Sequence, residues 1–286
     1  MKTFREVLAG EKPLIMPGVY DALSAKLARQ AGFEAMFISG YSVAATLLGE
    51  PDIGLLTQTE LVDAARRVCR TVDCPVIVDA DTGYGGVSNI FRTVNELEAA
   101  GAGGCFLEDQ LWPKRCGHMK GKKVVSIGEH VQRIRAACDA RKSRDFFIVA
   151  RTDARAAENS LDEAIRRAEA CKKAGADALF IEAPQSLDEL REIAKRLEPP
   201  FVANMLEGGM TPLLDRQELA ALGFTIAVFP LTGLYASAKA LSSVYGHLKD
   251  KGETRDIVGQ LLTFHDFHGI VGLEGHYALD KKYRVE

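Results

Sequence analysis

The sequence predicts a (β/α)₈ barrel, and three observations support this fold class. Eight short, continuously apolar segments alternate with longer amphipathic segments along the 286 residues, which is typical of parallel strands covered by helices on both faces. A glycine ends four of the amphipathic segments shortly before the next apolar run. Polar residues directly follow six of the apolar runs, at the strand ends where the functional residues of such a barrel collect.

The predicted strands are short and apolar. They cover residues 14–16, 35–38, 76–79, 104–108, 146–151, 178–182, 201–204 and 226–229. The clearest helix between them covers residues 161–174, because Leu161 and Ile165 recur at helical spacing against a charged face. Ser160 is placed to cap this helix, and Glu163 to complete a capping box.

A recurring glycine marks the ends of four predicted helices. The positions are Gly32, Gly101, Gly175 and Gly223. Glycine adopts the left-handed conformation that stops a helix, so the repetition indicates a repeated helix–turn–strand unit. The alternative architecture is an open doubly wound sheet, but the sequence has no dinucleotide-type glycine loop to support it.

The chain continues past the eighth helix–strand unit. We therefore predict a catalytic barrel over residues 1–250 and a C-terminal helical arm over residues 251–286. The arm is rich in apolar residues, and such segments usually pack on something. Packing on its own barrel and exchange with a neighbouring subunit are both consistent with the sequence.

The composition excludes several classes of function. The hydrophobic content of 47% and charged content of 26% are ordinary for a globular protein, and the net charge of −3 provides no basic field for nucleic acid or anionic membranes. No apolar run approaches transmembrane length, and the first residues lack the core of a signal peptide. Six scattered cysteines show neither metal-binding nor disulfide-scaffold spacing. We expect a cytoplasmic protein without nucleic-acid or membrane partners.

The segment 108–123 is the most informative part of the sequence. It places Cys116 beside His118 and among four cations, which are Lys114, Arg115, Lys120 and Lys122. Neighbouring positive charge favours a thiolate, and glycines let such a segment move. The pattern predicts a reactive, catalytic Cys116 on a mobile loop; the alternative is an ordinary solvated loop.

Six predicted strands end in polar residues, which would meet on one rim of the barrel. In strand order they are Ser39, Gly40 and Tyr41, then Asp79 and Asp81, then Glu108, Arg151, Glu182 and Asn204. Asp79 and Asp81 would repel each other unless a cation or a proton relieved them. Oxygen ligands without histidine suit Mg²⁺ or Mn²⁺, and Glu108 offers a third oxygen. The alternative for the two aspartates is a helix cap or a salt bridge to Arg151.

The remaining polar candidates suit an anionic substrate. Arg151 offers a planar fork for a carboxylate, although it can equally be a structural partner of Asp79 or Glu182. Asn204 and Thr232 can donate hydrogen bonds to an anionic oxygen or cap helices. His118 can orient the substrate or carry a proton.

Three motifs, at residues 79–85, 114–118 and 150–154, together resemble the isocitrate lyase/phosphoenolpyruvate mutase superfamily. The resemblance extends over nearly the whole chain, from about Pro17. It is strongest to the branch that holds 2-methylisocitrate lyase, 2,3-dimethylmalate lyase, the petal-death protein and carboxyvinyl-carboxyphosphonate phosphorylmutases. It implies a TIM-type barrel, a C-terminal helix exchanged between subunits, a homotetramer built as a dimer of dimers, and a Mg²⁺-dependent site.

The resemblance also implies a role for each candidate residue. The metal shell would be Asp79, Asp81, Asp52 and Glu108. The catalytic residues would be Cys116, Lys114, His118 and Tyr41. The substrate-binding residues would be Ser39, Gly40, Tyr41, Gly117, His118, Arg151, Glu182, Asn204, Pro230 and Thr232.

The same resemblance favours one reaction. Cys116 favours C–C cleavage, because the phosphoenolpyruvate-type mutases carry no cysteine in this loop. Pro230 favours a lyase over the oxaloacetate hydrolases, which have serine near this point. Met119 and Tyr41 replace the arginine and glycine typical of methylisocitrate lyases, which favours a smaller 2-hydroxy diacid such as a 2-alkylmalate.

The implied activity is a Mg²⁺-dependent retro-Claisen cleavage of a 2-hydroxy carboxylate. The products would be a 2-oxoacid such as pyruvate and a carboxylic acid, with Cys116 as the proton donor and Tyr41 as a weak candidate for the base. Three alternatives stay open. They are an oxaloacetate hydrolase or decarboxylase, a carboxyphosphonoenolpyruvate phosphonomutase, and a non-catalytic metabolite-binding barrel.

Overall fold

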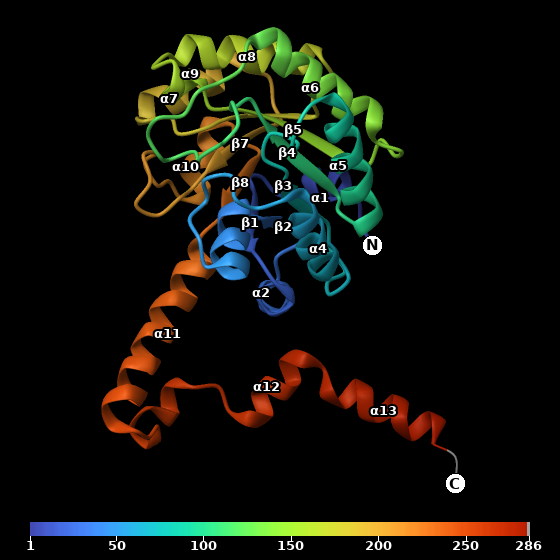
Figure 1. Cartoon of the computed structure of the whole chain (residues 1–286), viewed down its shortest axis with the longest axis vertical. Coiled ribbons are helices and arrows are strands. Elements are labelled where there is room, and N and C mark those ends of the chain that lie inside the picture. Colours follow the sequence, from blue (N-terminus) through green and yellow to red (C-terminus); the bar gives the residue numbers. More distant parts are fainter. Residues whose placement is uncertain (285–286) are drawn as a thin grey trace. The chain divides into compact units, whose positions relative to one another are not determined.

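The computed structural model describes residues 1–284 and contains a closed barrel of eight parallel strands in sequence order, β8 pairing with β1. The strands are β1 (Leu14–Val19), β2 (Met36–Ile38), β3 (Val76–Asp79), β4 (Gly104–Glu108), β5 (Phe147–Thr152), β6 (Ala178–Ile181), β7 (Phe201–Asn204) and β8 (Ile226–Phe229). Figure 1 shows the barrel with helices around it. The predicted (β/α)₈ fold class is confirmed, and each predicted strand coincides with an observed one.

Helices follow the strands as the alternating pattern predicts. Those of the barrel are α1 (Phe4–Leu8), α2 (Ala22–Gln30), α3 (Gly40–Val43), the π-helix η1 (Ala44–Leu48), α4 (Gln58–Cys69), α5 (Val87–Ala100), α6 (Ile127–Ala140), α7 (Ala154–Ala157), α8 (Leu161–Lys173), α9 (Leu187–Arg196) and α10 (Arg216–Leu222). The helix α11 (Thr232–Lys251), the 3₁₀ helix η2 (Arg255–Gln260), α12 (Phe264–Val271) and α13 (Leu273–Tyr283) complete the chain. The four helix-ending glycines have positive φ angles of 93°, 96°, 109° and 88°, so they stop their helices as predicted.

The predicted N-cap of α8 is confirmed, but its predicted capping box is not. Ser160 caps α8, because its Oγ accepts from the Glu163 amide at 3.2 Å. The predicted capping box is wrong, since the Glu163 carboxylate accepts instead from Arg166 and Arg167 at 2.8 Å each. An ion pair to a guanidinium has therefore replaced the bond to the backbone.

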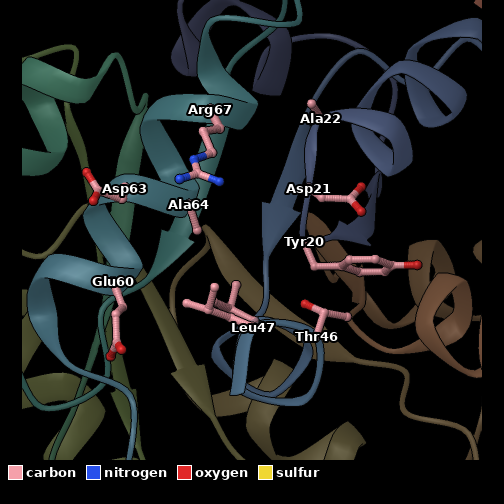
Figure 2. Close-up of a pocket in the computed structure, with 10 residues that line it drawn as sticks. Tyr20, Asp21, Ala22, Thr46, Leu47, Glu60, Asp63, Ala64 and Arg67 are labelled. Carbon is pink, nitrogen blue, oxygen red and sulfur yellow. The ribbon is translucent and has the colours of Figure 1, made fainter. Parts of the chain in front are cut away.

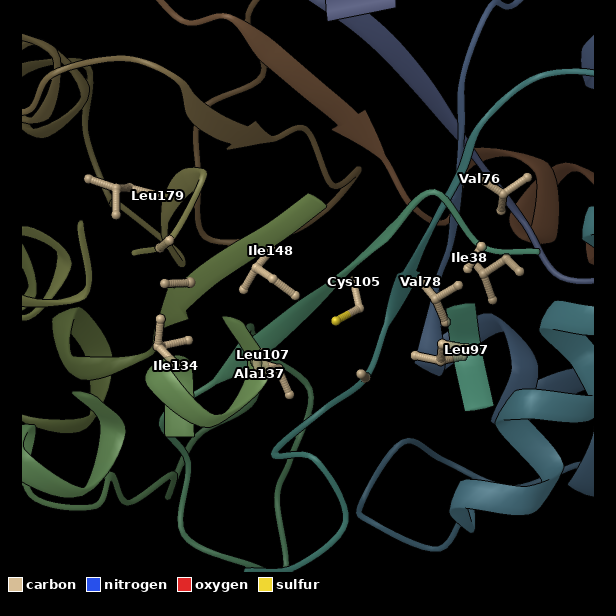
Figure 3. Packing of buried hydrophobic residues seen from close by; sticks show 14 of the residues in the cluster. Ile38, Val76, Val78, Leu97, Cys105, Leu107, Ile134, Ala137, Ile148 and Leu179 are labelled. Carbon is tan, nitrogen blue, oxygen red and sulfur yellow. The ribbon is translucent and has the colours of Figure 1, made fainter. Parts of the chain in front are cut away.

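The strands are continuously apolar in sequence because their side chains are buried on both faces of the barrel wall. Phe106 of β4 points into the barrel, where its ring centroid lies 4.8 Å from Phe37 and 5.6 Å from Phe180. Its neighbours Cys105 and Leu107 belong to the layer between strands and helices (Figure 3). A rigid wall of this kind holds the strand ends in fixed positions.

The described part of the chain divides into two compact units, residues 1–233 and 234–284. The last two residues of the predicted arm, 285 and 286, lie outside the described residues. The second unit has many exposed apolar side chains, among them Leu241, Tyr245, Leu248, Val258, Leu262, Phe264, Tyr277, Leu279 and Tyr283. The predicted boundary between catalytic barrel and arm at residue 250 stays a prediction. None of the helices between residues 1 and 284 combines the length and apolar composition that a membrane crossing needs.

Candidate active site

The predicted site residues gather at the carboxyl ends of the strands, around a cavity of about 40 Å³. The predicted residues that line this cavity are Ser39, Tyr41, Asp52, Asp79, Cys116, Gly117, His118, Arg151, Glu182, Asn204 and Pro230. Asp79, Arg151 and Asn204 belong to β3, β5 and β7. The others come from α3 and from the loops that follow β2, η1, β4, β6 and β8. The structure therefore brings the cysteine and the first aspartate of the Asp79/Asp81 pair to one cavity, as the sequence predicted.

Arg151 lies at the centre of a group of carboxylates because of the strand register. β4 and β5 pair with Glu108 opposite Arg151, and the guanidinium lies 3.3 Å from Glu108 Oε2, 3.4 Å from Glu182 Oε2 and 2.9 Å from Asp153 Oδ2. Burial opposes the charged form, but Asp153 and Glu108 raise the pKa of Arg151 well above its ordinary value. Arg151 lines the cavity and also binds carboxylates of the protein. It can therefore bind a substrate carboxylate and serve as a structural partner at the same time.

The predicted metal-binding acids are buried together with Lys114. The Lys114 ammonium lies 2.5 Å from Asp52 Oδ1 and 2.5 Å from Asp81 Oδ1. Burial raises the pKa of Asp79, and it raises the pKa of Asp81 to about 7 despite the opposing charge of Lys114. Asp81 also has a positive φ of 49°, a strained conformation of the kind that clusters at functional sites.

These acids fit a hydrated divalent cation. Burial raises the pKa of Glu108 well above its ordinary value, and its buried Oε1 has no hydrogen-bond partner among the described residues. A cation would favour the ionised forms of all these carboxylates. Between residues 1 and 284, the only three metal-ligating groups within 4.8 Å of one another are His247, Glu253 and Asp256 in the second unit. The predicted acids are thus more widely spaced, which suits ligation through water.

The loop after β4 covers the cavity. We call residues 110–124 the cavity loop, because the isolated bridge between Gln110 and Val124 closes its base. Gly117 is pressed against the rim: a Cβ atom there would lie 2.4 Å from Glu182 Cγ and 2.6 Å from Arg151 Nη2. Only glycine permits so close an approach.

His118 joins the cavity loop to the ends of β6 and β7. Its Nδ1 accepts from the Met210 amide at 2.8 Å, so the neutral ring carries its proton on Nε2. That nitrogen lies 3.2 Å from Glu182 Oε1 and 3.4 Å from Asn204 Nδ2. Burial opposes the ionised form of Glu182, but Arg151 and His118 lower its pKa below the ordinary value. The backbone of the loop after β7 thus fixes the tautomer of His118.

The sequence-based expectation of a thiolate at Cys116 is wrong. Burial raises the pKa of Cys116 to about 11, so the group is a thiol at neutral pH. Two of the neighbouring cations bind other groups and do not pair with the Cys116 sulfur. Lys114 binds Asp52 and Asp81, and Lys122 binds Asp153 and the Gly117 carbonyl. A half-buried thiol that lines the cavity and keeps its proton is a source of that proton rather than a nucleophile.

Thr232 differs most from its predicted role. It is exposed, and its hydroxyl donates to Glu207 at 2.5 Å, so it does not line the cavity. The chain turns into α11 directly after Pro230 and Leu231, which carries Thr232 away from the rim. Gly40, another predicted substrate-binding residue, does lie close to the predicted metal-binding acids. A Cβ atom at this position would lie 3.4 Å from Asp81 Oδ1.

Two components of the site were not predicted from the sequence. One is Asp153, which accepts from Arg151 at 2.9 Å and from Lys122 at 2.7 Å. Its place in the conspicuous Arg-Thr-Asp motif at the end of β5 was the available signal. The other is an apolar wall, formed by Phe37, Phe180, Leu206, Val228 and Leu231. In sequence these residues are indistinguishable from ordinary core.

A larger cavity, of about 400 Å³, lies elsewhere on the barrel. It lies between the turn after β1, η1 and α4, and Tyr20, Leu47 and Arg67 are among its lining residues (Figure 2). It contains neither the cysteine nor the acids of the strand ends. Size alone therefore does not identify the candidate active site, whereas the convergent polar groups do.

The sequence is similar to a family model and to several known proteins. The family model described as phosphoenolpyruvate phosphomutase matches residues 4–247. The chain is 50% identical to the chloroplastic carboxyvinyl-carboxyphosphonate phosphorylmutase of Arabidopsis thaliana, covering 98% of this chain and 84% of that protein. It is 49% identical to the petal death protein of Dianthus caryophyllus (99% and 89% covered). It is 43% identical to the 2,3-dimethylmalate lyase of Eubacterium barkeri (98% and 96% covered).

Solved structures with the same fold include enzymes of several activities. An oxaloacetate acetylhydrolase bound to 3,3-difluorooxalacetate superposes with a TM-score of 0.92 at 34% identity, covering 98% of this chain and 95% of that one. A 2,3-dimethylmalate lyase superposes with a TM-score of 0.91 at 33% identity (99% and 96% covered). A phosphonopyruvate hydrolase at 30% identity, with a TM-score of 0.88 (98% and 97% covered), was solved with oxalate and Mg²⁺.

Proposed function

Because the chain belongs to the phosphoenolpyruvate mutase/isocitrate lyase superfamily, we propose that it is a Mg²⁺-dependent C–C lyase. Its substrate would be a 2-hydroxy dicarboxylate of the 2-alkylmalate type, and its products a 2-oxoacid such as pyruvate and a carboxylic acid. The observation that carries this proposal is the position of the Cys116 thiol, which lines one cavity together with Arg151 and Asp79.

The acids would hold the metal ion, directly or through water. Asp79 and Asp81 are the main candidate ligands, and Asp52 and Glu108 would complete the metal shell. Mn²⁺ would be an acceptable substitute for Mg²⁺. A bound divalent cation supplies Lewis acidity toward the hydroxyl and carboxylate oxygens of a substrate. The Lys114 ammonium already lies among these acids, which supports a preference of this pocket for positive charge.

The residues of the chain would bind the substrate and transfer protons. Arg151 and Asn204 line the cavity and offer donors to a carboxylate. In the cleavage, the hydroxyl proton leaves to a base, the C–C bond breaks, and its electron pair remains on the carboxylic acid product. Cys116 then gives its proton to that carbon, and the closed loop excludes competing water. Tyr41 lines the same cavity and is the candidate for the base.

The lining of the cavity supports a dicarboxylate with alkyl groups. Among the described residues that line it, Arg151 alone carries a permanent positive charge, whereas a tricarboxylate would need further cations. Phe180, Leu206 and Leu231 provide an apolar surface for alkyl substituents.

Two other activities have specific support. The likeness to oxaloacetate acetylhydrolase favours hydrolysis of oxaloacetate to oxalate and acetate, and the likeness to a carboxyvinyl-carboxyphosphonate phosphorylmutase favours phosphonate chemistry. We place both below the lyase, because a cysteine at 116 and a proline at 230 resemble the lyases of the family.

A screen of pyruvate release tests the proposal. The substrates are 2,3-dimethylmalate, other malates that carry a 2-methyl group, 2-methylisocitrate and oxaloacetate, each with Mg²⁺ and with EDTA. We expect an alkylmalate to release pyruvate most rapidly, with loss of activity in EDTA and recovery on adding Mg²⁺. Oxalate and acetate from oxaloacetate as the dominant reaction would establish the hydrolase instead.

The exposed apolar residues of the second unit support an assembly of subunits. We propose a homotetramer formed as a dimer of dimers, with the C-terminal arm exchanged between subunits, in the cytoplasm. Sedimentation velocity of the full chain at several concentrations measures the assembly state.

A further inference from the structure

Lys122 is buried although it belongs to the cavity loop. Its side chain is 1% exposed, whereas the neighbouring Lys120 and Lys123 are exposed. The Lys122 ammonium donates to the Gly117 carbonyl and lies 2.7 Å from Asp153 Oδ1. Removing an ammonium from water is costly unless it is paired and hydrogen-bonded, so these two partners must determine where Lys122 lies.

The two partners of Lys122 belong to different parts of the molecule. Gly117 is at the centre of the cavity loop, between Cys116 and His118. Asp153 belongs to the barrel, where its amide donates to Asp109 Oδ1 at 2.8 Å and its carboxylate accepts from Arg151 at 2.9 Å. Lys122 therefore connects the tip of the loop to a fixed point of the barrel.

We propose that Lys122 is a positioning residue that holds the cavity loop closed and thereby keeps Cys116 against the cavity. Its importance for catalysis rests on the proposed lyase function. The closed cavity of about 40 Å³ is far below the ~300 Å³ at which small-molecule sites begin. The loop must therefore open to admit a substrate and close again, and Lys122 provides an interaction that only the closed position satisfies.

Asp153 links this closure to the substrate-binding arginine. The same carboxylate accepts from Lys122 and Arg151, at 2.7 Å and 2.9 Å. Closure of the loop thus completes the set of charges that orients the guanidinium, in the manner of induced-fit sites that assemble on closing.

The test compares Lys122→Met with Lys123→Met, which removes the same charge from an exposed neighbour. The measurement is the rate at which iodoacetamide alkylates Cys116, followed by peptide mass spectrometry, with the partly buried Cys69 and Cys138 as internal references. We expect Lys122→Met to accelerate labelling of Cys116 by about tenfold or more, as expected for loss of a hydrogen bond to a charged group. Lys123→Met should label at the wild-type rate.

An unchanged rate at Cys116 in Lys122→Met would overturn the proposal, as would equal acceleration at all three cysteines. If Lys122→Met does not fold, the measurement is made on Lys122→Gln, which removes the charge that binds Asp153 and so releases the loop from the barrel, and an unchanged rate there has the same meaning. Failure of both variants to fold would assign Lys122 to the stability of the barrel and overturn the proposal. Labelling needs no turnover, so this result is independent of the pyruvate assay.

Discussion

The close approach of Gly117 to the barrel rim leads to a quantitative prediction for Gly117→Ala. The added methyl group would lie 2.4 Å from Glu182 Cγ and 2.6 Å from Arg151 Nη2, whereas ordinary contacts of this kind begin at 3.4 Å. The tip of the cavity loop must therefore withdraw by about 1 Å, a displacement that can cost about 100-fold in the rate of a positioned reaction. We expect kcat/KM for pyruvate release to fall by that factor, with an unchanged thermal midpoint of the barrel.

Gly128→Ala is the matched control for this prediction. Its methyl group would meet nothing closer than Ser126 Oγ at 4.0 Å, and it lies in α6 (Ile127–Ala140), so activity should remain at the wild-type level. Wild-type kcat/KM in Gly117→Ala would refute the reasoning, because the loop would then not be pressed against the rim during turnover.

Three further predictions concern pH and metal. Burial lowers the pKa of His130 from 6.5 to about 4, so the folded protein binds fewer protons than the unfolded chain between these values. Its stability should fall by about 2 kcal/mol between pH 7.5 and pH 5, and urea unfolding of His130→Asn should show a smaller loss. Labelling of Cys116 by iodoacetamide should rise about tenfold per pH unit from pH 8 to pH 10, whereas a plateau near pH 9 would contradict its raised pKa. Mg²⁺ should raise the thermal midpoint, and Asp79→Asn should need roughly tenfold more Mg²⁺ for half the effect; an equal requirement would exclude Asp79 from the metal site.

The fold and the location of the site were predictable because they depend on patterns along the chain. Burial on both faces makes the strands continuously apolar, and the barrel topology brings every strand end to one rim. Glu108 and Arg151 were predictable from their positions at the carboxyl ends of β4 and β5, and the strand register places them opposite each other. For such residues, position in the sequence determines position in space.

The direction of the loop side chains was not predictable from the sequence. Lys114 and Lys122 are near Cys116 along the chain, which suggested a thiolate. In the structure they bind Asp52 and Asp153, which lie 62 and 31 residues away, and burial then dominates the pKa of the cysteine. A charge pattern along a loop does not reveal which partner each charge meets, because tertiary contacts decide this.

Thr232 and the capping of α8 show the same limit on a smaller scale. Thr232 follows a strand end, but the next helix turns its hydroxyl toward Glu207. Glu163 stands at the capping-box position of α8, yet guanidinium groups of the same helix bind it more strongly than the backbone does. In both cases the residue binds another side chain and does not take the role that its position in the sequence predicted.

The most direct test of the account is the turnover of Cys116→Ser on the alkylmalate that the wild-type protein cleaves fastest. We predict a loss of pyruvate release of at least about 100-fold, with the thermal midpoint and its response to Mg²⁺ retained. Pyruvate release at the wild-type rate would show that another group donates the proton, and would contradict the central role given to the Cys116 thiol.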